Sequence, residues 1–134
     1  MWRVASCVLV ASAACGDAPG VADASVSQYD ADPMWTTIDN RGFPDGAAKH
    51  TTGAIYNVDD QAFTRVSPRP VGEWNDFVLR AVGQTYTVLL NGAQTTRFDN
   101  PDPARGAAAP AFIGLQTHPA PGTISYRNIR IRAL

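Results

Sequence analysis

The feature that most constrains the fold is the alternation of apolar and polar side chains in residues 112–134, FIGLQTHPAPGTISYRNIRIRAL. A Pro-Gly turn lies between two short runs rich in Ile, Leu, Thr and aromatic residues. A period of two is typical of a strand with one face in a core and the other in solvent. The segment therefore predicts two closing strands of an antiparallel sheet.

A meander is predicted directly upstream. Residues 74–82, 85–90 and 93–98 each have strand composition, and short turns separate them. The second turn is Asn91-Gly92, which is a strong hairpin signal because both residues tolerate the positive φ of a type I′ turn. These three segments are expected to pair in sequence as antiparallel neighbours.

The remaining chain predicts short strands and long loops. Further strands are expected at residues 26–29, 34–38 and 52–57, with loops at 39–49, 58–71 and 99–110. Alternating strands joined by long loops indicate an all-β protein, an antiparallel β-sandwich. At 134 residues the chain is long enough for one such domain.

Charge and cysteine usage exclude several classes of function. Eleven basic and twelve acidic side chains give a formal net charge of −1, so we expect no nucleic acid partner and no attraction to an anionic membrane. Both cysteines, Cys7 and Cys15, precede the expected domain. A disulfide, a cysteine nucleophile and a thiolate metal site are therefore excluded within it.

The N-terminal fifteen residues resemble a short bacterial export signal, with one Arg followed by a run of apolar and small residues. The motif SAAC, ending at Cys15, is similar to a lipoprotein box in which Cys15 is lipidated, although Ser12 stands where Leu is usual. We expect a signal at 1–15, a tether at 16–25 and the domain at 26–134. This predicts a periplasmic or cell-surface lipoprotein whose only membrane contact is the anchor. A misassigned start codon is the alternative.

Three segments resemble one carbohydrate-active family. TTGAIYN, GEWNDFVLRAVGQTYTVLLNG and AFIGLQTH…SYRNIRIRAL are similar, in order and spacing, to the 3-keto-disaccharide hydrolase domain family from about Pro33 to Leu134. The resemblance implies a concanavalin-like jelly roll. The family's opening strands have no counterpart before Pro33, so we expect a jelly roll that is incomplete on its N-terminal side, with an unpaired sheet edge.

The resemblance also implies a reaction on a carbohydrate partner. A carbonyl at C3 acidifies the C2 hydrogen and makes the C1 glycosidic oxygen a β-leaving group, so elimination followed by hydration would cleave the bond. That route needs a base, an electrophile for the enolate and an acid. A divalent metal is one candidate for the electrophile. A pair of carboxylates that flanks the bond is the rival mechanism.

Catalytic and metal-binding roles are implied for three residues, which are His50 in KHTTGAIY, Asp39 in TIDN and His118 in GLQTH. The structural alternatives are a surface histidine for His50 and turn chemistry for Asp39. Asp45, in the FPDG segment, is predicted to be a turn residue.

Substrate contacts are implied for five further residues: Gln116, Asn40, Tyr56, Trp74 and Arg127. The alternatives are sheet-edge pairing for Gln116, a turn role for Asn40, core packing for Trp74 and Tyr56, and bracing of the sheet for Arg127. The family's Glu-x-Gln is replaced here by Met34 and Thr36, and its Asp before the second histidine by Thr117. A non-catalytic lectin-like module and a truncated inactive remnant therefore stand beside the hydrolase.

Overall fold

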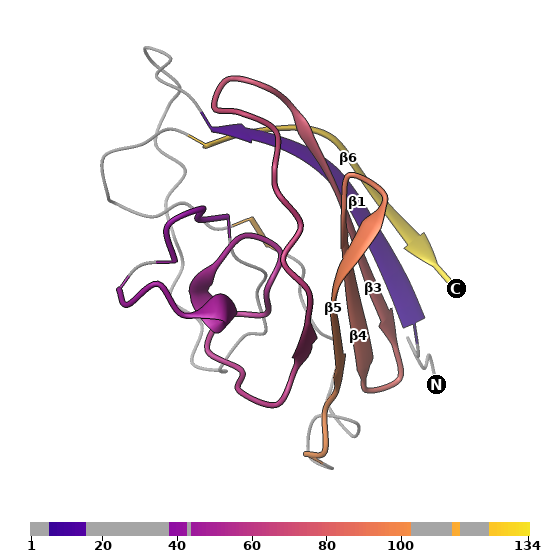
Figure 1. Cartoon of the computed structure of the whole chain (residues 1–134). Coiled ribbons are helices and arrows are strands. Elements are labelled where there is room, and N and C mark those ends of the chain that lie inside the picture. The colour runs from indigo at the N-terminus through magenta and orange to yellow at the C-terminus, as the bar shows by residue number, and fades with distance from the viewer. Residues whose placement is uncertain (1–5, 16–37, 43, 103–113, 116–123) are drawn as a thin grey trace.

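A computed structural model of the chain describes residues 6–15, 38–42, 44–102, 114–115 and 124–134. These residues form one six-stranded antiparallel sheet with the order β2-β5-β4-β3-β1-β6 (Figure 1). The elements are β1 (Ser6–Cys15), the 3₁₀-helix η1 (Ala48–His50), β2 (Ala62–Phe63), β3 (Asn75–Val82), β4 (Thr85–Leu90), β5 (Ala93–Asp99) and β6 (Ile124–Ala133). The predicted all-β antiparallel class is confirmed. In the described ranges no helix is long and apolar enough to cross a membrane.

The central meander β3-β4-β5 forms as predicted, with ends that differ by at most one residue. Asn91 and Gly92 have φ values of 51° and 83°, as a type I′ turn between β4 and β5 requires. Phe77 lies opposite Leu90 in the β3–β4 register, so the two side chains share a face of the sheet. The periodicity thus determined both the pairing and the face that is buried.

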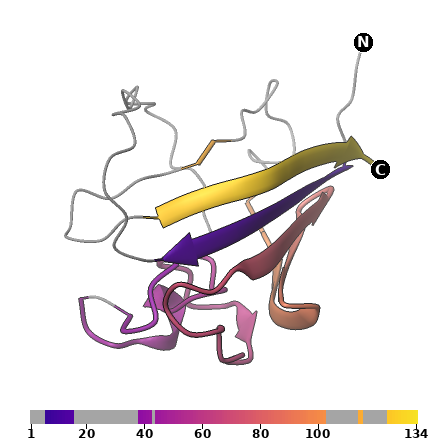
Figure 2. The same ribbon diagram turned by 90° about the horizontal axis from the view of Figure 1, so that it is seen from above.

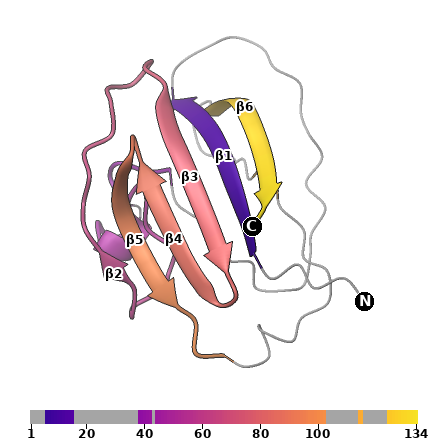
Figure 3. The same ribbon diagram turned by 90° about the vertical axis from the view of Figure 1, so that its right-hand side faces the viewer.

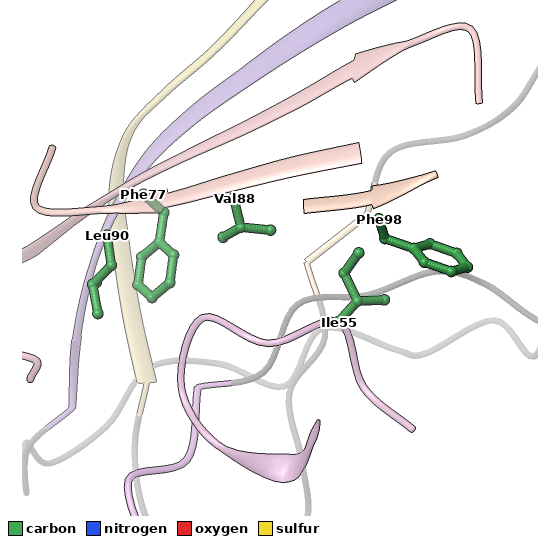
Figure 4. Packing of buried hydrophobic residues seen from close by; sticks show 5 residues of the cluster. All are labelled: Ile55, Phe77, Val88, Leu90 and Phe98. Atoms are coloured by element: carbon green, nitrogen blue, oxygen red, sulfur yellow. The ribbon is translucent and has the colours of Figure 1, made fainter. Parts of the chain in front are cut away.

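The core lies between the sheet and a loop layer, defined here as residues 38–42 and 44–71, which packs on one face (Figures 1 and 2). Four sheet side chains and one loop side chain, Ile55, lie on the side of the sheet that faces the loop layer (Figure 4). Burial of each large apolar side chain contributes roughly 1.5–3 kcal/mol. The cluster comprises Ile55, Phe77, Val88, Leu90 and Phe98.

Buried threonines hold the loop layer to the sheet. The Oγ1 hydroxyls of Thr95 and Thr96 both donate to the Gly53 carbonyl at 2.8 Å. Gly53 has a φ of +88°, and a Cβ there would lie 2.8 Å from the Thr95 hydroxyl oxygen. Only glycine therefore fits this contact without displacing Thr95.

The strand predicted at residues 52–57 is wrong, because these residues form turns with a single bridge at Ile55. Gly53 and Asn57 have positive φ values of 88° and 59°, which interrupt an extended backbone. The Gln61 side-chain amide replaces a partner strand: its Oε1 accepts from the Ile55 N–H at 2.8 Å and its Nε2 donates to the Ile55 carbonyl at 2.7 Å. The backbone is satisfied without a ladder.

Residues 6–15, expected to be part of a signal, form the strand β1 inside the sheet. This strand pairs with β3 on one side and β6 on the other (Figure 3). An apolar run of this length fits a buried strand as well as an export signal, so composition alone could not separate them. The division into a signal at 1–15, a tether at 16–25 and a domain at 26–134 stays a prediction, as do export and lipidation of Cys15.

The terminal strand is confirmed as β6, which forms one edge of the described sheet (Figure 3). Of its predicted partner, only Gly114 and Leu115 are described, without regular structure. The strand expected at 26–29, the strand expected at 34–38 apart from Ile38, and most of the loop at 99–110 lie outside the described residues.

Candidate functional site

The most distinctive polar contact is between His50, the last residue of η1, and Asp45. Nδ1 of His50 lies 2.6 Å from Oδ1 of Asp45, and only 7% of the histidine side chain is exposed. The same Asp45 oxygen accepts the Ala47 N–H at 2.9 Å. That backbone hydrogen bond, and then the one with His50, hold the pKa of Asp45 below its usual 3.8. The carboxylate is therefore ionised at neutral pH.

This pairing determines how the imidazole of His50 can act. An ionised carboxylate only accepts, so a neutral ring must carry its proton on Nδ1. Nε2 is then the basic nitrogen, and no hydrogen bond to it is found from the part of the chain that the structure describes. The arrangement is that of a carboxylate-oriented histidine base.

An aromatic side chain lies beside this pair. The ring centroids of Tyr56 and His50 are 5.0 Å apart with a 39° interplanar angle, and 36% of Tyr56 is exposed. Tyr56 thus offers part of a ring to solvent next to a buried histidine, as a contact for a pyranose would require. A separate contact on the same loop is the ion pair between Lys49 and Asp59 at 2.7 Å.

The side chains of Asp39 and Asn40 serve the loop itself. Oδ1 of Asp39 accepts the N–H groups of Arg41 and Gly42 at 2.8 and 3.2 Å, the turn chemistry weighed as the alternative. Oδ1 of Asn40 accepts the Thr52 hydroxyl at 2.6 Å. These bonds hold the start of the loop layer against the segment that follows His50, but no hydrogen bond or ion pair joins Asp39 to His50.

Two shallow, adjoining hollows open on the loop layer. They share Asn40, Thr52 and Pro68, and Thr51, the neighbour of His50, lines one of them. Arg65 borders that hollow and donates from Nη2 to the Asn40 carbonyl at 3.1 Å. His50 itself lines neither hollow.

Trp74 and Arg127 are brought together, but away from His50. The Arg127 guanidinium carbon lies 3.9 Å from the centroid of the Trp74 ring. Tyr126 packs against the core, so alternation along β6 places Arg127 on the opposite face. The sheet separates these two residues from the loop layer, and the predicted site is divided between its two faces.

The structure describes little or nothing of the other predicted site residues. His118 and Gln116 lie outside the described residues, and Cys15 ends β1 without a described side chain. The described ranges contain no group of three His, Cys, Asp or Glu side chains able to hold a metal.

Asp45 is the residue that the sequence missed as a functional candidate. It was expected to be a turn residue, and it does occupy a turn, with its bond to the Ala47 N–H. The available signal was a carboxylate five residues before a histidine in a tight, Gly-containing loop. A bend of this kind can fold the aspartate back onto the ring.

The comparisons with known proteins agree with this fold. A solved structure described as a "Putative glycosyl hydrolase" from Parabacteroides distasonis has a TM-score of 0.62 and 24% sequence identity, covering 96% of this chain and 78% of that chain. No curated protein matches. The chain thus shares the all-β fold of that structure. Residues 23–132 match the 3-keto-alpha-glucoside-1,2-lyase-like domain, and the chain belongs to that family.

Proposed function

We propose that this domain cleaves the glycosidic bond of 3-keto-glycosides, with His50 as the general base. The observation that supports this most is the 2.6 Å contact between His50 and Asp45, which leaves Nε2 as the basic nitrogen. The expected activity of the family and the fold of the similar glycosyl hydrolase agree with a carbohydrate substrate.

The chemistry follows from the C3 carbonyl. Nε2 of His50 takes the C2 proton, and the electrons of the C2–H bond move into an enolate. The enolate collapses to the C3 carbonyl with a C1–C2 double bond and expels the C1 oxygen, which takes a proton from the His50 imidazolium and leaves as the hydroxyl of the second sugar or aglycone. Water then adds across the C1–C2 double bond, with hydroxyl on C1 and hydrogen on C2, and gives the free 3-keto sugar.

Asp45 and Tyr56 have supporting roles in this proposal. Asp45 holds the imidazole in one tautomer and stabilises the imidazolium that forms when Nε2 takes the proton. Tyr56, 5.0 Å from the imidazole and partly exposed, contacts the sugar ring. No step of this proposal is assigned to a metal.

Release of free sugar from a 3-keto-disaccharide tests the proposal. Replacing His50 with Ala is expected to lower kcat by about 10²–10⁴-fold, the usual contribution of a general base. Asp45→Asn is expected to lower kcat more than it raises KM, since it disturbs the base and not the sugar contacts. Asp60→Asn removes an exposed carboxylate in the same layer and is the matched control. Equal rates in the wild type and His50→Ala would refute the assignment.

A second candidate function is a lectin-like binding module. It is favoured by the low exposure of His50 and by the hollows beside Asn40, which that histidine does not line. Calorimetric titration with the same 3-keto-disaccharide separates the two functions. Binding that Asn40→Ala weakens, with no sugar released at any pH, would support the module and exclude the enzyme.

A further inference from the structure

The face of the sheet turned away from the loop layer carries a row of arginines. Alternation from the core residues Phe77 and Phe98 places Arg80 and Arg97 on this outer face, which Figure 3 views directly. Both lie opposite Thr87 of β4. The outer face is the one already assigned to Arg127. We call these residues the arginine face: Arg80, Arg97, Arg127, Arg130 and Arg132.

The register of β6 assigns its last two arginines to the same face. Val8 of β1 lies opposite both Arg80 and Arg132, and Val10 lies opposite both Val78 and Arg130. Residues directly opposite one another on neighbouring strands share a face, so Arg132, Arg80 and Arg97 form one row across the sheet. All five members of the arginine face are exposed.

Positive charge exceeds negative charge on this face. Arg97 is paired with Asp99 at 3.1 Å, and Asp76 lies 3.7 Å from Arg69. For Arg80, Arg130 and Arg132 the described residues supply no ion pair. Five guanidinium groups against two carboxylates give a net local charge of about +3 on a domain whose formal total is −1.

The spacing of the row restricts the ligand. Arg132, Arg80 and Arg97 are each separated by two strand intervals, which is about 9.5 Å. A polysaccharide with one carboxylate in each disaccharide repeats its charge on a comparable scale. Nucleic acid has a far denser charge, about one for every 1.7 Å of duplex axis, and strong binding to it needs a more basic protein.

We propose that the arginine face binds an anionic polysaccharide with one hexuronate per disaccharide, separately from the catalytic site. Between the arginines the face presents the Thr87 side chain, and at its end the Trp74 ring supports the Arg127 guanidinium. Each arginine can form a bidentate bond with a carboxylate. Such a surface would hold the domain on acidic polymer while the loop layer stays accessible.

Binding of the full-length chain to hyaluronan at low salt tests this proposal. The double variant Arg80→Gln/Arg132→Gln should weaken binding by about 5- to 20-fold, from exposed charge pairs that each contribute up to about 1 kcal/mol. Added salt should reduce the affinity of the wild type more steeply than that of the variant. Arg41→Gln removes an exposed charge from the loop layer and should bind as the wild type does.

Several results would overturn the proposal. They are an unchanged affinity in the double variant, an equal loss in Arg41→Gln, or tighter binding to single-stranded DNA or phosphatidylglycerol vesicles than to hyaluronan. Neutral dextran should not bind. His50→Ala should bind hyaluronan as the wild type does, so a failure of the proposed catalytic function would leave this result intact.

Discussion

At the scale of single residues, His50 and Asp45 differ in how far the sequence could predict them. His50 was a candidate because a histidine in a matching segment stands out, whereas Asp45 looked like an ordinary turn residue. The turn and the contact with the ring are one feature, since the carboxylate oxygen accepts from both Ala47 and His50. Trp74 and Arg127 were predicted to share a substrate site with His50. The sequence did not show that they lie on the other face of the sheet.

Gly53 provides a stability test at this scale. Its φ is +88°, and an added Cβ would lie 2.8 Å from the Thr95 hydroxyl in the buried contact. Gly92 has a similar φ of +83° but nothing within 4 Å of an added Cβ, so it is the matched control. We expect Gly53→Ala to lower the free energy of unfolding by about 2–4 kcal/mol, against about 1 kcal/mol for Gly92→Ala. Equal urea midpoints would contradict the packing described for Gly53.

At the scale of elements, alternation determined the strands of the meander and β6, while the loop layer was harder to predict. The Gln61 amide bonds both backbone groups of Ile55, so a segment with strand composition remains in turns. Long-range contacts of this kind leave no periodic pattern in the sequence. Prediction of β1 was limited in a similar way, because its apolar run is compatible both with an export signal and with a strand of the sheet.

The position of β1 inside the sheet predicts that the fold requires this strand. The strand separates β3 from β6, so removing residues 1–14 should leave β6 without its described partner and β3 with an unpaired edge, since β3 keeps only β4. We expect that truncated chain to aggregate or to lose its β-sheet circular dichroism signal, whereas the full chain remains folded. A mature protein that begins at a lipidated Cys15 and is still folded and monomeric would show that the sheet does not need β1. Intact mass and circular dichroism decide between these outcomes.

At the scale of the whole molecule, side chains whose pKa changes on folding predict how the stability of the domain varies with pH. The pKa of Asp45 is lowered by its Ala47 and His50 bonds, and that of Asp99 by the Thr85 hydroxyl and Arg97. A lowered pKa in the folded state adds stability above the usual value of 3.8, and that stability is lost as pH falls through the folded value. The melting temperature should therefore decrease below about pH 4, and Asp45→Asn should weaken this decrease. An acid limb identical in the variant and the wild type would contradict the role of Asp45.

At alkaline pH the direction is reversed, because the groups involved have a raised pKa in the folded state and stability falls as pH increases. Burial raises the pKa of Tyr126 above 10, and the Asp59 contact raises that of Lys49 above 10.5. A raised pKa in the folded state adds stability that is lost as pH increases through the folded value. Ultraviolet titration should show Tyr126 ionising above pH 10, as a late step that Tyr126→Phe removes. A late step that persists in the variant would assign it to another tyrosine.

The central claim is that His50 removes the C2 proton of a 3-keto-glycoside. The most direct measurement follows C2 by nuclear magnetic resonance while the domain cleaves a 3-keto-disaccharide in deuterated water. Elimination and hydration predict that the released 3-keto sugar carries deuterium at C2, and that His50→Ala stops both label uptake and release. A released sugar that keeps its original C2 hydrogen would contradict the account and support direct displacement at C1.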